Sequence, residues 1–270
     1  VDLVSRKRIE AHMNDDQIRA YLDAAVEFAR IGGKTSLQYF GDRKLTVERK
    51  SDASPVTEAD LNTERSIRAA IERRFPEHSI VGEEYGGTLG THRREWIIDP
   101  IDGTKSFVRG VPLYTTLVAF VVEKKPIVGV IYAPATGETV SAAIGLGAWN
   151  ERGERLHVSA CRTLSDSWVG TTDPHDLVER YSEFGINLIR SCSAMRTWAD
   201  AYGYLLLARG ALDVMVDPIM SPWDIAPLSI VVREAGGMFT AIDGTNNDLG
   251  SSAVAASTPQ LHSAVLSCFP

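Results

Sequence analysis

The chain has 270 residues and a formal net charge of −7, with 44% hydrophobic and 23% charged residues. This length suits one large domain or two modest ones, and the composition is that of an ordinary soluble globular protein. The negative charge disfavours nucleic acid as a partner, and the longest apolar run, Leu117 to Val122, is far shorter than the ~20 residues that span a membrane.

Cysteine usage and the first residues bear on where the protein acts. Cys161, Cys192 and Cys268 are widely separated, which favours a reducing compartment over a disulfide framework or a cysteine-rich zinc site. Residues 1–13 are polar and basic and lack the apolar core of a signal peptide, so we interpret them as a native extension or a tag remnant. We therefore predict a cytoplasmic protein with no membrane partner.

The pattern of residues 14–155 predicts an α+β half. Apolar residues three and four apart predict a helix over residues 14–40, which we expect to weaken or bend at Gly32 and Gly33, and a second amphipathic helix over residues 57–75. The expected strands are residues 45–50, 79–82, 96–98, 113–122, 126–132 and 139–143, with turns at residues 51–55 and 145–153.

A strand expected at residues 156–158 opens the second half, residues 156–270. Strands are expected at residues 168–171, 187–191 and 213–216, and helices at residues 174–184, 199–209 and 223–235. Gly236 and Gly237 are expected to close the last of these helices. Because strands and helices alternate, we predict that this half is α/β.

Carboxylates gather at the ends of the predicted elements. Asp99 and Asp102 follow the buried strand 96–98, and such a pair is costly unless a metal, a helix N-terminus or an arginine compensates it. The other carboxylates at element edges are Asp60, Glu83, Glu84 and Asp224. Ligands that offer only oxygen suit a hard cation, magnesium first, whereas zinc favours His and Cys. Each also has an ordinary explanation, as a helix-start residue for Asp60 and Asp224 and as a turn for the others.

Gly103 and Thr104, directly after Asp102, have the pattern of a helix N-terminus with exposed amides, which is a ready site for an anion. Cations that neutralise a phosphate and activate water, placed beside amides that hold phosphate oxygens, are the parts required for phosphoryl transfer to water. Composition and spacing therefore predict a magnesium-dependent phosphatase.

Four motifs, in this order along the chain, resemble the inositol monophosphatase family of lithium-sensitive, magnesium-dependent sugar phosphatases. They are Pro55-Val56-Thr57-Glu58-Ala59-Asp60, Gly82-Glu83-Glu84, Asp99-Pro100-Ile101-Asp102-Gly103-Thr104, and Trp223-Asp224 before a helix that ends in Glu234-Ala235-Gly236-Gly237. The resemblance spans residues 55–237 and implies a layered αβαβα sandwich. It also implies a homodimer, a small phosphorylated metabolite as substrate, and two to three Mg²⁺ ions, with Mn²⁺ as a substitute and Li⁺ as an inhibitor.

The resemblance also implies roles for individual residues. The implied metal ligands are Glu83, Asp99, the backbone carbonyl of Ile101, Asp102 and Asp224. Thr104, hydrogen-bonded to Asp60, would orient and deprotonate the attacking water, and Glu83 would reach a third ion through a further water. The amides of Gly103 and Thr104 would hold the phosphate, with Asp102 and Asp224 also lining the substrate site. Glu84 and Lys50 also match positions near the site.

The substrate prediction depends on other residues. The segment 104–112 resembles the histidinol-phosphate phosphatase branch, because Arg109 stands where inositol enzymes usually carry His. Asp200 and Asp217 are expected to face the substrate, and two acids suit the ammonium and imidazole of histidinol phosphate better than the hydroxyls of inositol phosphate. Trp198 could stack on an imidazole and Arg196 could pair with the acids.

Ordinary explanations remain for these residues, since Asp200 could cap a helix and Trp198 could be a buried aromatic. The main prediction is hydrolysis of L-histidinol phosphate to L-histidinol and phosphate, in histidine biosynthesis. The alternatives are an inositol 1-phosphate or broader sugar-phosphate and bisphosphate phosphatase, or a regulatory module that keeps the fold. The complete ligand set disfavours the regulatory module.

Overall fold

Two β-sheets organise the protein, and a computed structural model describes residues 13–42, 45–49, 55–198, 200–246 and 248–269. The first sheet has the strand order β3-β4-β5-β6-β7-β8-β9 and the second has the order β11-β10-β12-β14-β13. A short antiparallel pair, β1 (Val47–Arg49) and β2 (Pro55–Thr57), lies beside them.

The bounds of the strands are as follows. The seven-stranded sheet contains β3 (Ser79–Gly82), β4 (Arg94–Asp102), β5 (Thr115–Val122), β6 (Lys125–Ala133), β7 (Glu138–Ala143), β8 (Gly147–Asn150) and β9 (Arg155–Leu156). The five-stranded sheet contains β10 (Trp168–Gly170), β11 (Ala194–Arg196), β12 (Val214–Asp217), β13 (Met238–Thr240) and β14 (Ala253–Ala256).

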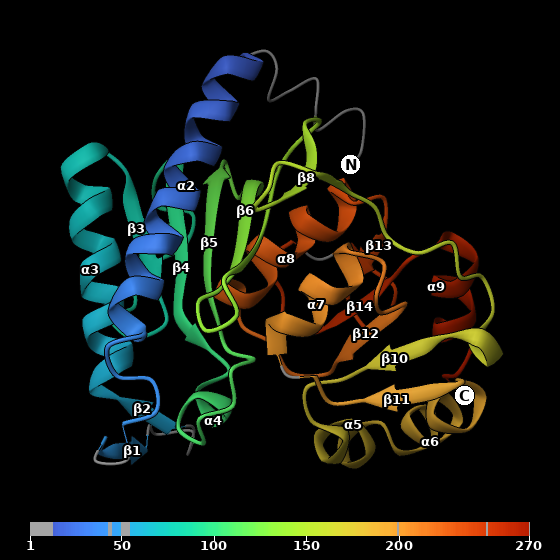
Figure 1. Cartoon of the computed structure of the whole chain (residues 1–270). Helices are drawn as coiled ribbons and strands as arrows, with labels where there is room; N and C mark the ends of the chain where they lie inside the picture. Colours follow the sequence, from blue (N-terminus) through green and yellow to red (C-terminus); the bar gives the residue numbers. More distant parts are fainter. Residues whose placement is uncertain (1–12, 43–44, 50–54, 199, 247, 270) are drawn as a thin grey trace.

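Helices form three further layers, which Figure 1 shows outside and between the two sheets. The outer layer on the seven-stranded sheet is α2 (Asp15–Ser36) and α3 (Glu58–Arg74), and the layer between the sheets is α7 (Asp200–Ala208) and α8 (Pro222–Glu234). The far face of the five-stranded sheet carries α5 (Pro174–Arg180), α6 (Ser182–Ser191) and α9 (Pro259–Leu266). This order confirms the predicted αβαβα sandwich.

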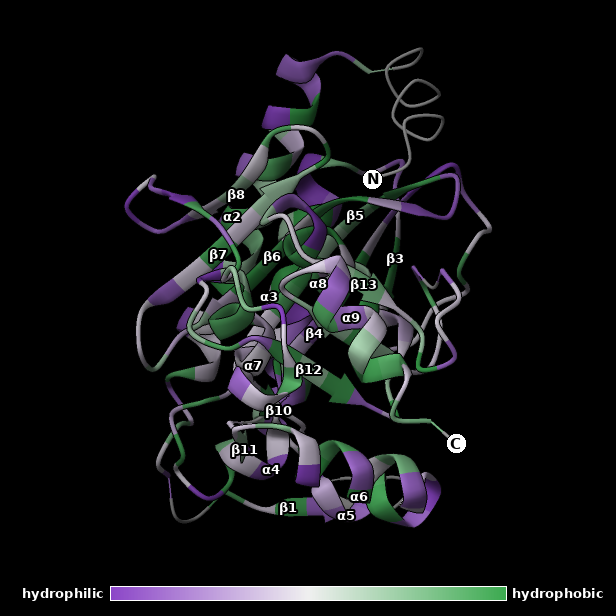
Figure 2. Ribbon diagram, turned by 90° about the vertical axis from the view of Figure 1, so that its right-hand side faces the viewer, coloured by the Kyte–Doolittle hydropathy of each residue, from purple (hydrophilic) through white to green (hydrophobic). Residues whose placement is uncertain are grey.

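The core lies on both faces of the long strands, and β5 shows why. Every residue of β5 is buried, and its side chains alternate between the two faces with the period of two that a strand imposes. Val118 and Phe120 pack against α2 and α3, whereas Leu117 and Ala119 belong to clusters on the side of α8. In Figure 2 the hydrophobic colour is accordingly concentrated on the central strands.

Glycines allow two helices to approach the sheet closely. A Cβ at Gly129 of β6 would collide with the Pro227 carbonyl oxygen in α8, so glycine lets α8 lie against the sheet. Gly32 and Gly33 lie within α2, which continues to Ser36, and a Cβ at either position would collide with Ile67 or Tyr132. α2 ends at Ser36, four residues earlier than predicted.

Several predicted elements differ from the structure. Residues 187–191, predicted as a strand, lie in α6, where Leu188 is buried while Ile189 is 43% exposed, as an amphipathic helix requires. The predicted helix 174–184 is two helices, interrupted at Tyr181, whose φ is −136°.

Two turn-rich or unassigned regions also contain regular structure. The stretch 145–153 contains β8, and β13, β14 and α9 were not predicted. The predicted division at residue 156 falls at β9, the last strand of the first sheet. The described helices include none with both the length and the apolar surface that crossing a bilayer demands.

Candidate active site

Three aspartates from distant parts of the chain meet near the C-terminal end of β4. Asp99 and Asp102 come from β4 and Asp224 from the first turn of α8, and one carboxylate oxygen of each lies within 4.8 Å of the others. The β4–β5 register shifts between Asp99 and Asp102, where Pro100 lacks the amide needed to continue the ladder. This shift lets both aspartates reach the same site.

Each aspartate is held by hydrogen bonds to its surroundings. The amide of Ile101 donates to Asp99 Oδ1 at 3.0 Å. Asp102 Oδ2 accepts from Thr115 Oγ1 at 3.1 Å and from the amide of Ala201, at the start of α7, at 2.7 Å. The sequence analysis did not identify Thr115 or Ala201 as partners of Asp102, because neither lies in a motif.

Asp224 is both a helix cap and a member of the cluster. Its Oδ2 accepts from the Ser221 amide at 2.7 Å within a capping box, and it also shares a hydrogen bond with Asp99. The helix-start explanation of Asp224 is therefore correct but incomplete, since one side chain does both.

The electrostatics of the cluster fit a bound cation. Burial, followed by Glu83, Asp102 and Asp224, raises the pKa of Asp99 well above its usual value. Burial also raises the pKa of Asp102, with Asp200 and Asp224 adding to it, and burial raises the pKa of Asp224 to about 7. One buried and two half-buried carboxylates that repel one another and offer only oxygen form a donor set that a hard divalent cation neutralises.

Glu83 joins the cluster because β3 and β4 are parallel. Gly82 pairs with Ile98, so the residues that follow, Glu83 and Asp99, emerge at the same edge of the sheet, and the Glu83 amide donates to the Ile98 carbonyl at 3.3 Å. The carboxylates of Glu83 and Asp99 interact directly. The Glu84 amide instead points to Glu64 on α3, at 2.7 Å from its Oε2.

Thr104 and Asp60 lie next to the end of β4. Thr104 begins the short helix α4 (Thr104–Phe107), and its Oγ1 lies 3.3 Å from Asp60 Oδ1 and 3.1 Å from the Ile101 carbonyl oxygen. Asp60 Oδ2 accepts from the amide and hydroxyl of Thr57 at 2.8 and 2.6 Å, so Asp60 also combines a capping role with a site contact. Burial raises the pKa of Asp60.

Gly103 shapes the entrance to α4. Its φ is +84°, and a Cβ there would lie 2.7 Å from Asp200 Oδ2, so only glycine fits between the turn and Asp200. The Gly103 carbonyl accepts from the amides of Ser106 and Phe107 at 2.9 and 3.0 Å. The amides at the start of a helix have no acceptor within the helix, so those that come before Ser106 face outward from the start of α4.

Asp200 and Asp217 are electrostatically linked. Burial and then Asp217 raise the pKa of Asp200 to about 7, and Lys105 opposes that rise. Asp200 also has a φ of +43°, which is unusual for a residue with a side chain. Asp217 is 2% exposed, and its oxygens accept from the Thr172 amide at 2.7 Å and the Tyr204 hydroxyl at 2.8 Å.

Arg196 and Trp198 contact Trp168 and their own surroundings, and the last predicted residue lies outside the described part of the chain. The Arg196 guanidinium lies 4.9 Å from the centre of the Trp168 ring, and its Nη1 donates to the Met195 carbonyl at 2.8 Å. Trp198 is partly buried against the core, with its ring 5.8 Å from Trp168. Lys50 lies outside the described residues.

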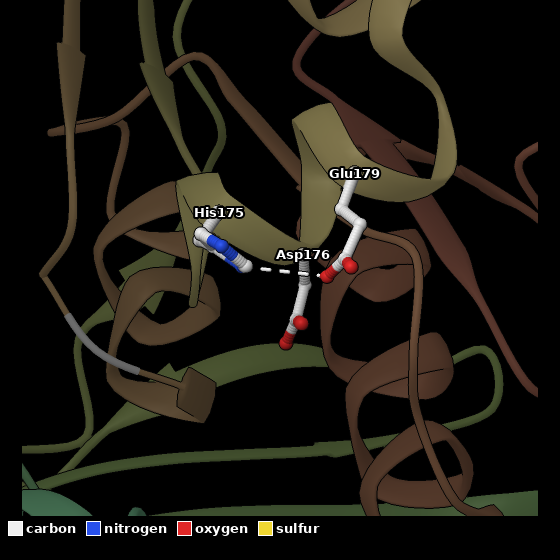
Figure 3. Close-up of side chains that lie close together, drawn as sticks. All are labelled: His175, Asp176 and Glu179. Atoms are coloured by element: carbon white, nitrogen blue, oxygen red, sulfur yellow. Dashed lines mark ion pairs between the residues drawn. The ribbon is translucent and has the colours of Figure 1, made fainter.

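A second group of metal-ligand type lies on the surface. His175, Asp176 and Glu179 project from α5, and Figure 3 shows the ion pair between His175 Nδ1 and Glu179 Oε2, 3.5 Å apart. The His175 and Glu179 side chains are 80% and 69% exposed, so water solvates them and no buried charge requires a cation. We interpret this group as an exposed helix-surface pair.

Comparisons with known proteins agree with this architecture and site. The model of the inositol monophosphatase family matches residues 17–269, and the chain belongs to this family. Its relatives include a histidinol-phosphatase from Chlorobaculum parvum, 42% identical with 87% of this chain and 95% of that protein covered, and one from Mycobacterium tuberculosis, 40% identical with 92% and 94% covered.

A solved structure also matches closely. The Thermotoga maritima IMPase superposes with a TM-score of 0.83 at 31% identity, and the match covers 92% of this chain and 96% of that one. The family and its phosphatase members establish the chain as a phosphoric monoester hydrolase, as the sequence predicted.

Proposed function

We propose that the protein is a Mg²⁺-dependent phosphatase that hydrolyses L-histidinol phosphate to L-histidinol and phosphate. The observation that carries the substrate is the identity of 40–42% to proteins named histidinol-phosphatase, against 31% to the Thermotoga maritima IMPase. The convergence of Asp99, Asp102 and Asp224 on one point supports the metal dependence.

Magnesium is the cation that the donor set favours. Two ions would be held by Glu83, Asp99, Asp102, Asp224 and the Ile101 carbonyl, and Glu83 would reach a third ion through water. Mn²⁺ would replace Mg²⁺, and Li⁺ would inhibit the enzyme. When bound, Mg²⁺ supplies charge neutralisation for the phosphate and lowers the pKa of water.

Thr104 and Asp60 provide the path for the proton of the attacking water. The single hydrogen of the Thr104 hydroxyl has two acceptors in reach, Asp60 Oδ1 at 3.3 Å and the Ile101 carbonyl oxygen at 3.1 Å. When it donates to Asp60, its lone pair accepts a hydrogen bond from the water. Thr57 holds Asp60 Oδ2, so the other oxygen stays directed at Thr104. The amides of Gly103 and Thr104 would hold the phosphate oxygens at the start of α4.

Asp200 would bind the cationic part of the substrate. Asp200 lies against Gly103, beside the phosphate seat, and Asp217 adds negative potential behind it. An ammonium or imidazolium placed here would relieve the repulsion between the two acids, whereas an inositol hydroxyl would not. Asp217 itself, with two internal partners, would act mainly through Asp200.

A phosphate-release assay tests this proposal. Histidinol phosphate, inositol 1-phosphate and fructose 1,6-bisphosphate are compared with Mg²⁺ and with EDTA. We expect release to require Mg²⁺ and kcat/KM to be highest for histidinol phosphate. Full activity in EDTA would refute the metal dependence, and a clear preference for inositol 1-phosphate would assign the chain to the alternative substrate.

The proposal also includes a cytoplasmic location and a homodimer. The three cysteines are free thiols, which suits the cytoplasm. The homodimer rests on family resemblance alone, and light scattering tests it by a mass of twice 29.5 kDa. A mass of 29.5 kDa at assay concentrations would contradict it.

A further inference from the structure

Buried carboxylates fasten the loop between β3 and β4 at both of its ends. Glu64, on the inner face of α3, is fully buried and holds the first residues of the loop, next to Glu83. Glu95 of β4 is 1% exposed and holds the far part of the loop, accepting from the Gly90 amide at 3.0 and 2.9 Å. A buried carboxylate is costly unless it is well paired, so both contacts must be strong.

The Glu64 carboxylate bonds directly to the backbone that follows Glu83. Its Oε2 accepts from the Glu84 amide at 2.7 Å, and its Oε1 accepts from the Tyr85 amide at 3.2 Å. The nitrogen of Glu84 is bonded to the carbonyl carbon of Glu83, so holding this amide fixes the peptide plane after Glu83. The direction of the Glu83 side chain therefore depends on Glu64.

Arg68 completes the contact by balancing the charge of Glu64. Its Nε lies 2.7 Å from Glu64 Oε1, and its Nη2 donates to the Gly86 carbonyl at 2.6 Å, so one guanidinium joins the carboxylate to the end of the turn. The Gly82 amide donates to the same carbonyl at 3.1 Å. A Cβ at Gly82 would collide with the Glu64 carboxylate, so this approach requires glycine.

We propose that Glu64, paired with Arg68, is a positioning residue that directs Glu83 at the aspartate cluster and so sets how tightly the site binds its divalent cation. This inference rests on the proposed role of Glu83 as a metal ligand. Glu64 follows Asp60 by one helical turn, so the inner face of α3 supports the site twice, at Thr104 and at Glu83.

Mg²⁺ binding to the metal-stripped full chain, measured by calorimetry, tests the inference without relying on turnover. A glutamine side chain has one oxygen that accepts hydrogen bonds and one NH2 group that only donates them. In Glu64→Gln the NH2 group therefore faces a backbone amide that also donates, so at least one hydrogen bond to the loop is lost. We expect its Kd for Mg²⁺ to rise about tenfold or more, the usual effect of losing a group that orients a ligand. Glu95→Gln is the matched control, and we expect its Kd to stay within about twofold of the parent, since Glu95 holds the loop away from Glu83.

Two further variants make each outcome decisive. Arg68→Met carries the test if Glu64→Gln does not fold, because the Arg68 side chain is 19% exposed, and a parent-like Kd in Arg68→Met would overturn the inference. Equal changes in Glu64→Gln and Glu95→Gln would also overturn it. If Glu83→Gln weakens Mg²⁺ binding and Glu64→Gln does not, the inference alone fails, whereas parent-like binding by Glu83→Gln overturns the metal site and the inference together.

Discussion

Replacing Asp224 by Asn should stabilise the metal-free protein and remove most of its stabilisation by Mg²⁺. Burial, with Glu83 contributing, raises the pKa of Asp224 from 3.8 to about 7. Asparagine keeps an oxygen that can accept from the Ser221 amide, now 2.7 Å from Asp224 Oδ2, so the helix cap survives. The substitution therefore removes the charge and keeps the cap, while the new amide nitrogen replaces an oxygen on the side that shares a hydrogen bond with Asp99.

The size and sign of the effect follow from the pKa of Asp224. Because folding raises this pKa, the native state binds the proton more tightly than the unfolded state, so stability falls as pH rises from about 4 to about 7. Above pH 7 the full cost of ionisation reaches about 4 kcal/mol. Neighbouring carboxylates that take up a proton relieve part of it, so we expect Asp224→Asn to gain about 1–4 kcal/mol.

Thermal unfolding in EDTA measures this gain. We expect the Tm of Asp224→Asn to exceed that of the parent by at least about 2 °C near pH 8, and the difference to shrink near pH 4. Adding Mg²⁺ should reverse the order, because only the parent keeps the full ligand set. Asp213→Asn is the control, since Asp213 accepts from the Trp168 amide at 2.7 Å outside the cluster, and we expect it to lose stability. A metal-free Asp224→Asn no more stable than the parent at pH 8 would refute the reasoning.

Three more predictions concern the reaction and the shape of the site. Thr104→Ala should lower kcat about 10²–10⁴-fold in steady-state assays, with the Kd for Mg²⁺ nearly unchanged, because it removes the link between water and Asp60; an unchanged kcat would contradict this role. Asp200→Asn should lower kcat/KM for histidinol phosphate about tenfold while sparing inositol 1-phosphate, and equal losses would show a purely structural role. Gly103→Ala should destabilise the fold by about 1–3 kcal/mol in urea titrations, because its φ is +84° and the new Cβ meets Asp200. Gly110 also has a positive φ, +72°, but no atom lies within 4 Å of a Cβ there, so Gly110→Ala should lose less stability.

Many helices and strands were predictable because their determinants are local in the sequence, whereas the layered order of the sandwich was implied by the resemblance to the family. The apolar run of β5 and the stripes of α2 and α3 have the periods of their elements, and the motifs mark where strands end in carboxylates. Parallel pairing of β3 with β4 then brings Glu83 and Asp99 to one edge. The periods of these elements require no knowledge of distant contacts, whereas the pairing of β3 with β4 is seen only in the structure.

Other elements depend on tertiary contacts that the sequence does not display. β14 is the segment Ala-Val-Ala-Ala, whose weak strand preference is overcome by pairing with β12 and β13 on its two sides. The apolar residues near Leu188 suit a strand or a helix equally when taken alone, and packing beneath the five-stranded sheet selects α6.

The site shows the same division. Motifs identified the carboxylates at element ends, but the double use of Asp60 and Asp224, as caps and as site residues, emerges only in three dimensions. Glu64 was missed although it offered a signal, since a glutamate one turn after Asp60 stands on the same face as buried Ile67. A charged residue on the apolar face of a helix requires a hydrogen-bonding partner, and here that partner is the loop that begins at Glu83.

Diffraction from crystals soaked in Mn²⁺, recorded at the manganese absorption edge, tests the central claim most directly. We expect anomalous peaks among Glu83, Asp99, Asp102 and Asp224, where one carboxylate oxygen from each of the three aspartates already lies within 4.8 Å of the others. Peaks confined to the exposed His175 and Glu179 of α5, or no peak at the aspartates, would contradict it.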